Sequence, residues 1–128
     1  MDPEFLNLAE VLEIHNDQID RYGGSFGVRD MGLLRSALAM PAGSFRGSFL
    51  HADLFEMAAA YLFHIVQNHP FVDGNKRTGA VAALVFLSLN DIEIDADEDS
   101  FEKMVLDVAA SRADKTTVAG FFREYAHR

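Results

Sequence analysis

Apolar side chains recur every three or four residues along most of the chain, which is the spacing of one face of an α-helix. The first such stretch begins at Asn7, where Asn7 and Glu10 have the spacing of a capping box, and a Gly-Gly pair ends it. Asp30 can cap a second, short helix, which ends at Pro41. The pattern therefore predicts two helices in the first third of the chain.

Two longer apolar stretches occupy the middle of the chain. Asp53 can cap the first, which should end near His69 because Pro70 disfavours helix in the residue before it. The second runs from about Asn75 to Leu89 and is apolar nearly all round, so it is predicted to be the central, buried helix. The first of these helices should bury a stripe made of Leu54, Met57, Ala58, Tyr61, Leu62, Ile65 and Val66.

The rest of the pattern predicts two more helices and little strand. Asp99 or Ser100 opens the fifth helix and Thr116 or Thr117 opens the sixth, with a short extended piece at residues 92–95. Residues 42–51, AGSFRGSFLH, alternate small, apolar and polar side chains, which indicates a loop or a short irregular hairpin. The predicted fold class is all-α, a compact bundle of about six helices.

Composition limits the classes of protein to consider. The 128 residues suit a single domain over residues 1–128, although residues 1–5, MDPEF, resemble a translated cloning linker and are left out of the fold argument. The absence of cysteine fits a reducing compartment, and we expect the cytoplasm. A net charge of −9 argues against direct nucleic-acid binding, and no apolar run is long enough for a membrane span.

The polar residues gather in one loop, NHPFVDGNKRTG at residues 68–79, between the two longest predicted helices. Gly74 allows a sharp turn there, and Asn75 can cap the helix that follows. Free amides at a helix start form an anion site, here predicted from the amides of residues 74–77. Lys76 and Arg77 add positive charge where helices usually carry acids, and a bound phosphate would offset that penalty.

Two further side chains complete the chemistry of this loop. His69 is of the type that most often serves as a base near neutral pH. Asp73 beside a phosphate site suits Mg²⁺, which is usually bound by one or two carboxylates and phosphate oxygens. The set indicates transfer of a phosphate-containing group to a hydroxyl. The ordinary alternative is a helix cap, turn residues and a solvated cationic patch.

At these residues the chain resembles the Fic family. The family signature, H-P-F-x-[D/E]-G-N-[G/K]-R, is matched at every position by HPFVDGNKR, residues 69–77. Lys76 followed by Thr78 is similar to the Doc branch, the "death on curing" toxins of toxin–antitoxin pairs. The RYGG sequence at residues 21–24 and the size of the chain agree with that branch.

The resemblance implies an all-helical fold with the signature between two central helices. It implies that His69 acts as base on a target hydroxyl, that Asp73 binds Mg²⁺ and that Phe71 is a buried anchor. It also implies a flap that binds the target's main chain by β-augmentation, for which residues 44–51 are the candidate. The residues implied to hold the phosphates of ATP are Gly74, Asn75, Lys76 and Arg77.

Two positions depart from the branch of the family that transfers nucleotidyl groups. That branch has Gly where this chain has Lys76, and a second Arg where it has Ala80. The lysine should crowd the phosphate path that a glycine leaves open, and Doc-type toxins transfer the terminal phosphoryl group instead. Their known target is elongation factor Tu.

The missing second arginine also favours control by a separate antitoxin. We expect a Phd-like partner that inserts a helical segment into a groove near the site. Two alternatives stay open. One is an enzyme of the same fold that transfers the whole nucleotidyl (AMP) group, and the other is a non-catalytic module that binds a nucleotide or the antitoxin.

Overall fold

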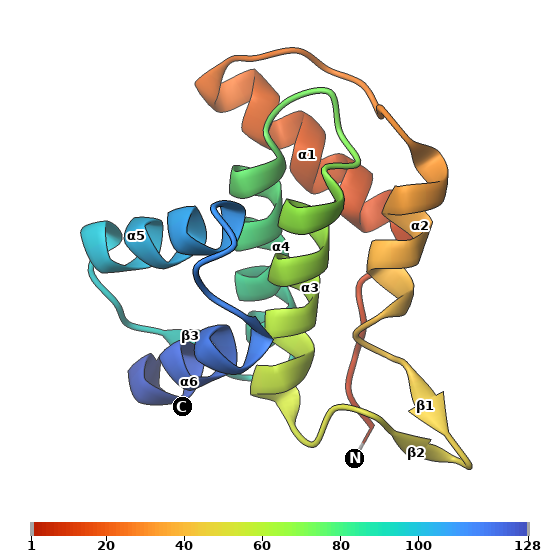
Figure 1. Cartoon of the computed structure of the whole chain (residues 1–128), viewed down its shortest axis with the longest axis vertical. Helices are drawn as coiled ribbons and strands as arrows, with labels where there is room; N and C mark the ends of the chain where they lie inside the picture. The colour runs from red at the N-terminus through yellow and green to blue at the C-terminus, as the bar shows by residue number, and fades with distance from the viewer. Residues whose placement is uncertain (1, 128) are drawn as a thin grey trace.

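The structure is a computed structural model that describes residues 2–127, and within them it contains six helices and four very short strands (Figure 1). The strands form two antiparallel pairs, and the predicted all-α class with about six helices is confirmed. The helices are α1 (Leu8–Tyr22), α2 (Met31–Ala39), α3 (Leu54–Asn68), α4 (Asn75–Leu89), α5 (Glu98–Ala109) and α6 (Lys115–Tyr125). The paired strands are β1 (Ser44–Phe45) with β2 (Ser48–Phe49), and β3 (Glu93–Ile94) with β4 (Ala126–His127).

Side-chain caps explain where most of the helices begin. The Asn7–Glu10 capping box is present at the start of α1, with both hydrogen bonds formed, as predicted. Aspartates cap α2, α3, α5 and α6. The last two helices begin one or two residues before their predicted starts. The carboxylates of Asp97 and Asp114 cap them by accepting the N–H groups of Ser100 and Thr117, each three residues later in the chain.

Helices α3 and α4 pack against each other at the centre of the fold (Figure 1). A Cβ at Gly79 would lie 3.0 Å from Val66 Cγ2 and 3.2 Å from the Leu62 carbonyl oxygen, so the missing side chain allows the close approach. The prediction that α4 is the central buried helix needs a correction. Helix α3 has the longer unbroken buried run, residues 57–62, and it also contacts α2, α5 and α6.

The hairpin of β1 and β2 lies at the opposite end of α3 from the signature loop (Figure 1). It precedes the start of α3, whereas the loop follows its end, and a helix of 15 residues is about 22 Å long. The prediction that residues 44–51 form a flap beside the site is therefore wrong.

Residues 23–30, which join α1 to α2 and which we call the α1–α2 segment, run beside the signature loop instead. The Arg29 N–H donates to the Pro70 carbonyl oxygen at 2.7 Å, and the Val72 N–H donates to the Gly27 carbonyl oxygen at 3.0 Å. An antiparallel bridge lies between these bonds. A segment close to the end of α1 thus becomes part of the site, because α1 packs along α4.

The N-terminal residues take part in the fold. The Phe5 ring lies 5.6 Å from the Phe86 ring and 5.7 Å from the Phe49 ring, and Leu6 is buried. Phe5 is therefore part of the packed structure, contrary to the expectation from its likeness to a cloning linker, whatever the origin of residues 2–5. Met1 lies outside the described residues.

A membrane span requires a helix that is both long and apolar. None of the helices in the part of the chain that the structure describes is both long enough and apolar enough to cross a bilayer.

Tyr61 ties the N-terminal segment to the core, and its replacement by phenylalanine tests that contact. The fully buried Tyr61 hydroxyl accepts the Leu6 N–H at 2.8 Å, and burial raises the pKa of Tyr61 to about 12. Tyr61→Phe should lower the free energy of unfolding by about 1–3 kcal/mol, because the Leu6 N–H then lacks an acceptor. Urea denaturation measures this.

Tyr125→Phe is the matched control. Within residues 2–127 the Tyr125 hydroxyl has no hydrogen-bond partner, so this change should stay within about 0.5 kcal/mol. Equal losses in the two variants would contradict the role of the Tyr61 hydroxyl.

Candidate active site

The loop between α3 and α4 is held in shape by Asn75. Its Oδ1 accepts the Phe71 N–H at 2.9 Å, and its Nδ2 donates to the Phe71 carbonyl oxygen at 3.0 Å. The predicted capping role of Asn75 is therefore wrong. Gly74 is the capping residue, with φ +74°, and it offers no side chain to the helix. The buried Asn75 carboxamide instead bonds back to Phe71 and so closes the loop that precedes α4.

Phe71 anchors the loop to the protein core. Its ring is fully buried and stacks on His15 of α1, with ring centroids 3.8 Å apart. His15 Nε2 lies 2.8 Å from the Asp73 carbonyl oxygen and donates to it. The expected anchor role of Phe71 is confirmed by this burial. The role of His15 was missed, although its position four residues from both Val11 and Ile19 on the buried face of α1 was a usable signal.

The start of α4 differs from the other helix starts. It has no side-chain cap and no acid in its first turn. Thr78 is the first residue whose N–H bonds within the helix, to the Gly74 carbonyl oxygen. Within the described residues, the N–H groups of Asn75, Lys76 and Arg77 have no acceptor, while that of Gly74 donates to Asp73 Oδ1 at 2.9 Å. Three of the four predicted amides are thus free for an anion.

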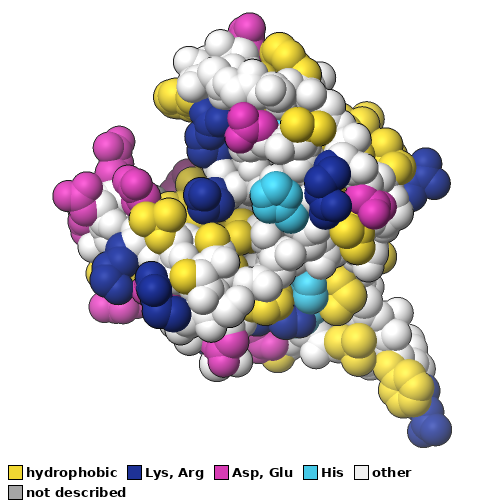
Figure 2. All heavy atoms as spheres, turned by 45° about the horizontal axis from the view of Figure 1, so that its top comes forward, with side chains coloured by type: hydrophobic (Ala, Val, Ile, Leu, Met, Phe, Trp, Pro, Cys, Tyr) yellow, Lys and Arg dark blue, Asp and Glu magenta, His cyan; other side chains and the backbone are white. Residues whose placement is uncertain are grey.

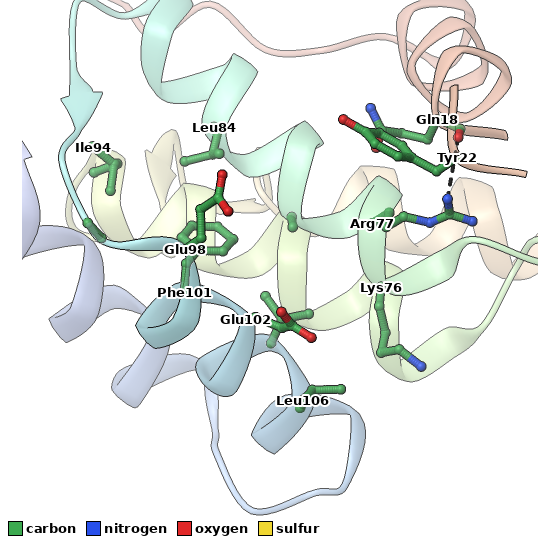
Figure 3. Close-up of a pocket in the computed structure, with 13 residues that line it drawn as sticks. Gln18, Tyr22, Lys76, Arg77, Leu84, Ile94, Glu98, Phe101, Glu102 and Leu106 are labelled. Carbon is green, nitrogen blue, oxygen red and sulfur yellow. Dashed lines mark hydrogen bonds between the residues drawn. The ribbon is translucent and has the colours of Figure 1, made fainter. Parts of the chain in front are cut away.

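The two adjacent cations point in different directions (Figure 3). Arg77 extends toward α1, where its Nη2 donates to the Gly23 carbonyl oxygen at 2.9 Å and its guanidinium lies 5.7 Å from the Tyr22 ring centre. Lys76 extends away from α1, is exposed and has no partner among residues 2–127. Lys76 is therefore the freer cation, and phosphate binding by Arg77 stays a prediction that would use its remaining donors.

His69 and Asp73 both line a cavity of about 480 Å³ at this helix start, and every predicted site residue lines it with them. His69 ends α3 with an exposed side chain. Asp73 is exposed as well, and the Ser25 N–H donates to its Oδ2 at 3.2 Å. The hydrogen bonds from Ser25 and Gly74 hold the pKa of Asp73 below its usual value, so the carboxylate is charged at neutral pH.

The space-filling view shows how charged side chains are distributed on one face of the molecule. On the face in Figure 2, one histidine lies between two groups of Lys and Arg side chains, with an acidic side chain close above it. This cationic patch interrupts a protein whose net charge is −9.

The residues present fit a magnesium ion only if a ligand supplies part of its coordination. Within residues 2–127 no cluster of three His, Asp or Glu side chains could hold a metal by itself. Asp73 offers a single charged carboxylate, and each of its oxygens accepts only one N–H bond. Magnesium is commonly held by one or two carboxylates with phosphate oxygens and water, so Asp73 beside the free amides suits a metal-bound phosphate.

A second, larger cavity of about 610 Å³ adjoins the first (Figure 3). Lys76 and Arg77 line both cavities. The second cavity, which we call the α1–α4–α5 groove, has largely apolar walls and two acidic side chains from α5, Glu98 and Glu102. A neighbouring groove of this kind could bind the rest of a ligand or a partner segment.

The α1–α2 segment is the part of the site that sequence reasoning missed. Gly23 binds Arg77, Ser25 binds Asp73, and the Arg29 side chain donates to the His69 carbonyl oxygen. The RYGG sequence was noted only as a likeness to the Doc branch. No local pattern indicates that residues 23–29 meet a loop 39 to 54 positions away.

The fold and site together are those of an all-helical protein with one loop suited to binding phosphate next to a histidine and a carboxylate. The sequence pattern described as "Fic/DOC family" matches residues 5–87. The chain belongs to the Fic/Doc family.

Two curated relatives extend the match over most of the chain. "Toxin Doc" of Mycolicibacterium smegmatis is 37% identical over 107 residues, which cover 82% of this chain and 82% of that protein. "Protein kinase doc" of Escherichia phage P1 is 30% identical over 114 residues, which cover 89% of each chain. The predicted resemblance to the Doc branch is thereby confirmed.

The missing side chain of Gly24 leaves room for the Asp73 carboxylate, and Gly24→Ala tests this. Gly24 has φ +114°, and a Cβ there would lie 2.7 Å from Asp73 Oδ2. The substitution should push the carboxylate off the Ser25 N–H. It should also lower the free energy of unfolding by about 1–2 kcal/mol from backbone strain alone, and further through the clash. Chemical denaturation and amide hydrogen exchange at Ser25 measure the two effects.

Gly47→Ala separates the strain from the clash. Gly47 also has a positive φ, +81°, but its added Cβ would meet nothing within 4 Å. The Gly24 variant should lose more stability than this control, and only the Gly24 variant should exchange its Ser25 amide faster. Unchanged Ser25 exchange in Gly24→Ala would contradict the contact.

Proposed function

We propose that this chain is a Doc-like toxin that transfers the terminal phosphoryl group of Mg-ATP to a hydroxyl of a translation factor and so inhibits protein synthesis. The observation that carries the proposal is the meeting of His69, Asp73 and Lys76 at the uncapped start of α4. The similarity to a curated Doc toxin and a curated Doc protein kinase supports both the toxin and the kinase activity.

Each side chain has a role that its surroundings suit. An imidazole nitrogen of the exposed His69 accepts the proton of the target hydroxyl as that oxygen becomes the nucleophile. The Asp73 carboxylate holds Mg²⁺, and the free amides of residues 75–77 hold phosphate oxygens. Mg-ATP supplies the phosphoryl group and the positive charge that stabilises the leaving oxygen. Gly74 contributes its backbone turn.

Lys76 favours phosphoryl transfer over nucleotidyl transfer. Its side chain lines both cavities, where a glycine would leave open space. Ala80 lines the groove where the nucleotidyl-transferring branch has an arginine. Transfer of the AMP group by the same residues is the second candidate, and a non-catalytic module that only binds a nucleotide or an antitoxin is the third.

The acceptor and the location follow from the same proposal. The acceptor proposed is elongation factor Tu, the target associated with the Doc branch, and an enzyme that acts on it works in the cytoplasm. All of the proposed site residues lie within residues 69–77 and line one cavity.

The α1–α4–α5 groove is the proposed binding site for a Phd-like antitoxin. Its apolar walls suit the apolar face of a helix, and Glu98 and Glu102 suit basic residues on that helix. A helix placed there would contact Lys76 and Arg77 and so reach the edge of the phosphate site. This would block the reaction without an inhibitory segment in the toxin itself.

The transferred group is identified by labelling ATP at either its terminal or its innermost phosphorus. Incubation with elongation factor Tu or a cell extract should place label from the terminal position on the target, in a Mg²⁺-dependent way. His69→Ala should abolish transfer while leaving nucleotide affinity within about threefold, because the phosphate-binding amides belong to the backbone. Label from the innermost position would overturn the kinase proposal in favour of nucleotidyl transfer.

Two variants sharpen this experiment. Lys76→Gly should reduce phosphoryl transfer to any acceptor, and undiminished transfer would remove the argument from Lys76. A His69→Ala protein that modifies its target as well as the parent would mean that His69 is not the base. Nucleotide binding with no transfer by the parent protein would favour the non-catalytic module.

Antitoxin binding is tested by Leu106→Arg. Leu106 is 43% exposed and lines the groove, so a charge there should weaken antitoxin binding at least about tenfold, measured by calorimetry with the coexpressed antitoxin. Leu89→Arg is the control, since Leu89 is similarly exposed, at 41%, but lies outside the groove. Equal affinity of both variants for the antitoxin would place its binding site elsewhere.

A further inference from the structure

His69 has a backbone conformation that needs support. Its φ and ψ of 51° and 52° lie in the left-handed region, where a residue with a Cβ costs roughly 1–2 kcal/mol. Such a conformation persists only when its surroundings fix it, and it commonly occurs at functional sites. The His69 imidazole has no hydrogen-bond partner among residues 2–127, so the backbone alone aims the ring.

The Arg29 side chain supplies that support. Its Nε donates to the His69 carbonyl oxygen at 2.7 Å, and its Nη2 donates to the Asn68 carbonyl oxygen at 3.0 Å. These carbonyls end α3, and without Arg29 they have no donor among residues 2–127. A cation at this end of a helix is also favoured by the helix dipole. The planar guanidinium fixes two consecutive peptide groups at once, which a single-point donor cannot do.

Backbone N–H groups of the α1–α2 segment hold Pro70, the residue that follows His69. The N–H groups of Arg29 and Asp30 both donate to the Pro70 carbonyl oxygen, at 2.7 and 3.0 Å. Asp30 is itself fixed, because it caps α2. Three consecutive carbonyls, those of residues 68–70, are therefore held by one pair of residues from the α1–α2 segment.

We propose that Arg29 is a positioning residue that aims the His69 imidazole at the acceptor hydroxyl. The proposal rests on the proposed role of His69 as base, and it assigns Arg29 no contact with ATP or with the target. Two of its five guanidinium N–H groups donate to the protein's own backbone, and its backbone N–H is bonded as well. The positive charge of Arg29 is not its main contribution to the site, since Lys76 already supplies a cation with no partner among residues 2–127.

Steady-state kinetics with Arg29→Ala, Arg29→Lys and Arg35→Ala test the proposal. Arg29→Ala should lower kcat by about 10- to 100-fold, the size of effect expected when a reacting group is misplaced by about 1 Å. Its KM for ATP should change by less than about twofold. Arg29→Lys keeps the charge but loses the two-point contact, so it should recover only part of kcat. Arg35→Ala removes an exposed cation of α2 that has no partner in the described chain, and it should behave like the parent.

Chemical rescue separates positioning from a general loss of structure. Free guanidinium, added below denaturing concentrations, should raise the kcat of Arg29→Ala but not that of His69→Ala. A rise in the KM for ATP with unchanged kcat would overturn the proposal, because it would mean that Arg29 binds phosphate. Unchanged kcat in Arg29→Ala would overturn it as well.

A readout without catalysis keeps this proposal distinct from the proposed function. NMR of the imidazole should give one sharp set of His69 signals in the parent and in Arg35→Ala, and shifted or multiple signals in Arg29→Ala. If the parent phosphorylates nothing, the proposed kinase function fails, while the NMR comparison still decides whether Arg29 fixes His69. Identical His69 signals in parent and Arg29→Ala would overturn the inference.

Discussion

The two hydrogen bonds between the Asn75 carboxamide and the Phe71 backbone are the constraint on which the rest of the site depends. They close a short loop between the two central helices and pair both the N–H and the carbonyl oxygen of Phe71. Phe71 is thereby fixed in the core against His15. The residues on either side of Phe71, including His69 and Asp73, then emerge at the surface in a set relation to the start of α4.

The loop separates residues that build the site from those that are free to react. Asn75 and Arg77 have the chemistry of phosphate ligands, yet most of their observed hydrogen bonds go to the protein's own backbone. What remains available is the imidazole of His69, the carboxylate of Asp73, the ammonium of Lys76 and three amides.

The α1–α2 segment, and not the hairpin, lies against the signature loop. It contacts the backbone of the signature loop, the Asp73 carboxylate and the Arg77 guanidinium. The hairpin is excluded by geometry, since the whole length of α3 lies between it and His69. Its aromatic side chains are exposed except where Phe49 meets Phe5, and no contact within residues 2–127 links them to the loop.

The sequence by itself determined the helices, the caps of the first three, the family and the identity of the residues that gather in the loop. These features depend on neighbours within one helical turn, such as Asn7 with Glu10 or Asp53 with Glu56, so local spacing encodes them. Only the tertiary structure decided which way the loop residues face. Asn75 turned back to Phe71 instead of capping α4, and Arg77 turned to α1. The contacts of Ser25 with Asp73 and of Arg29 with His69 join positions 48 and 40 residues apart, and no spacing along the chain encodes such contacts because they exist only once α1, α3 and α4 have packed together.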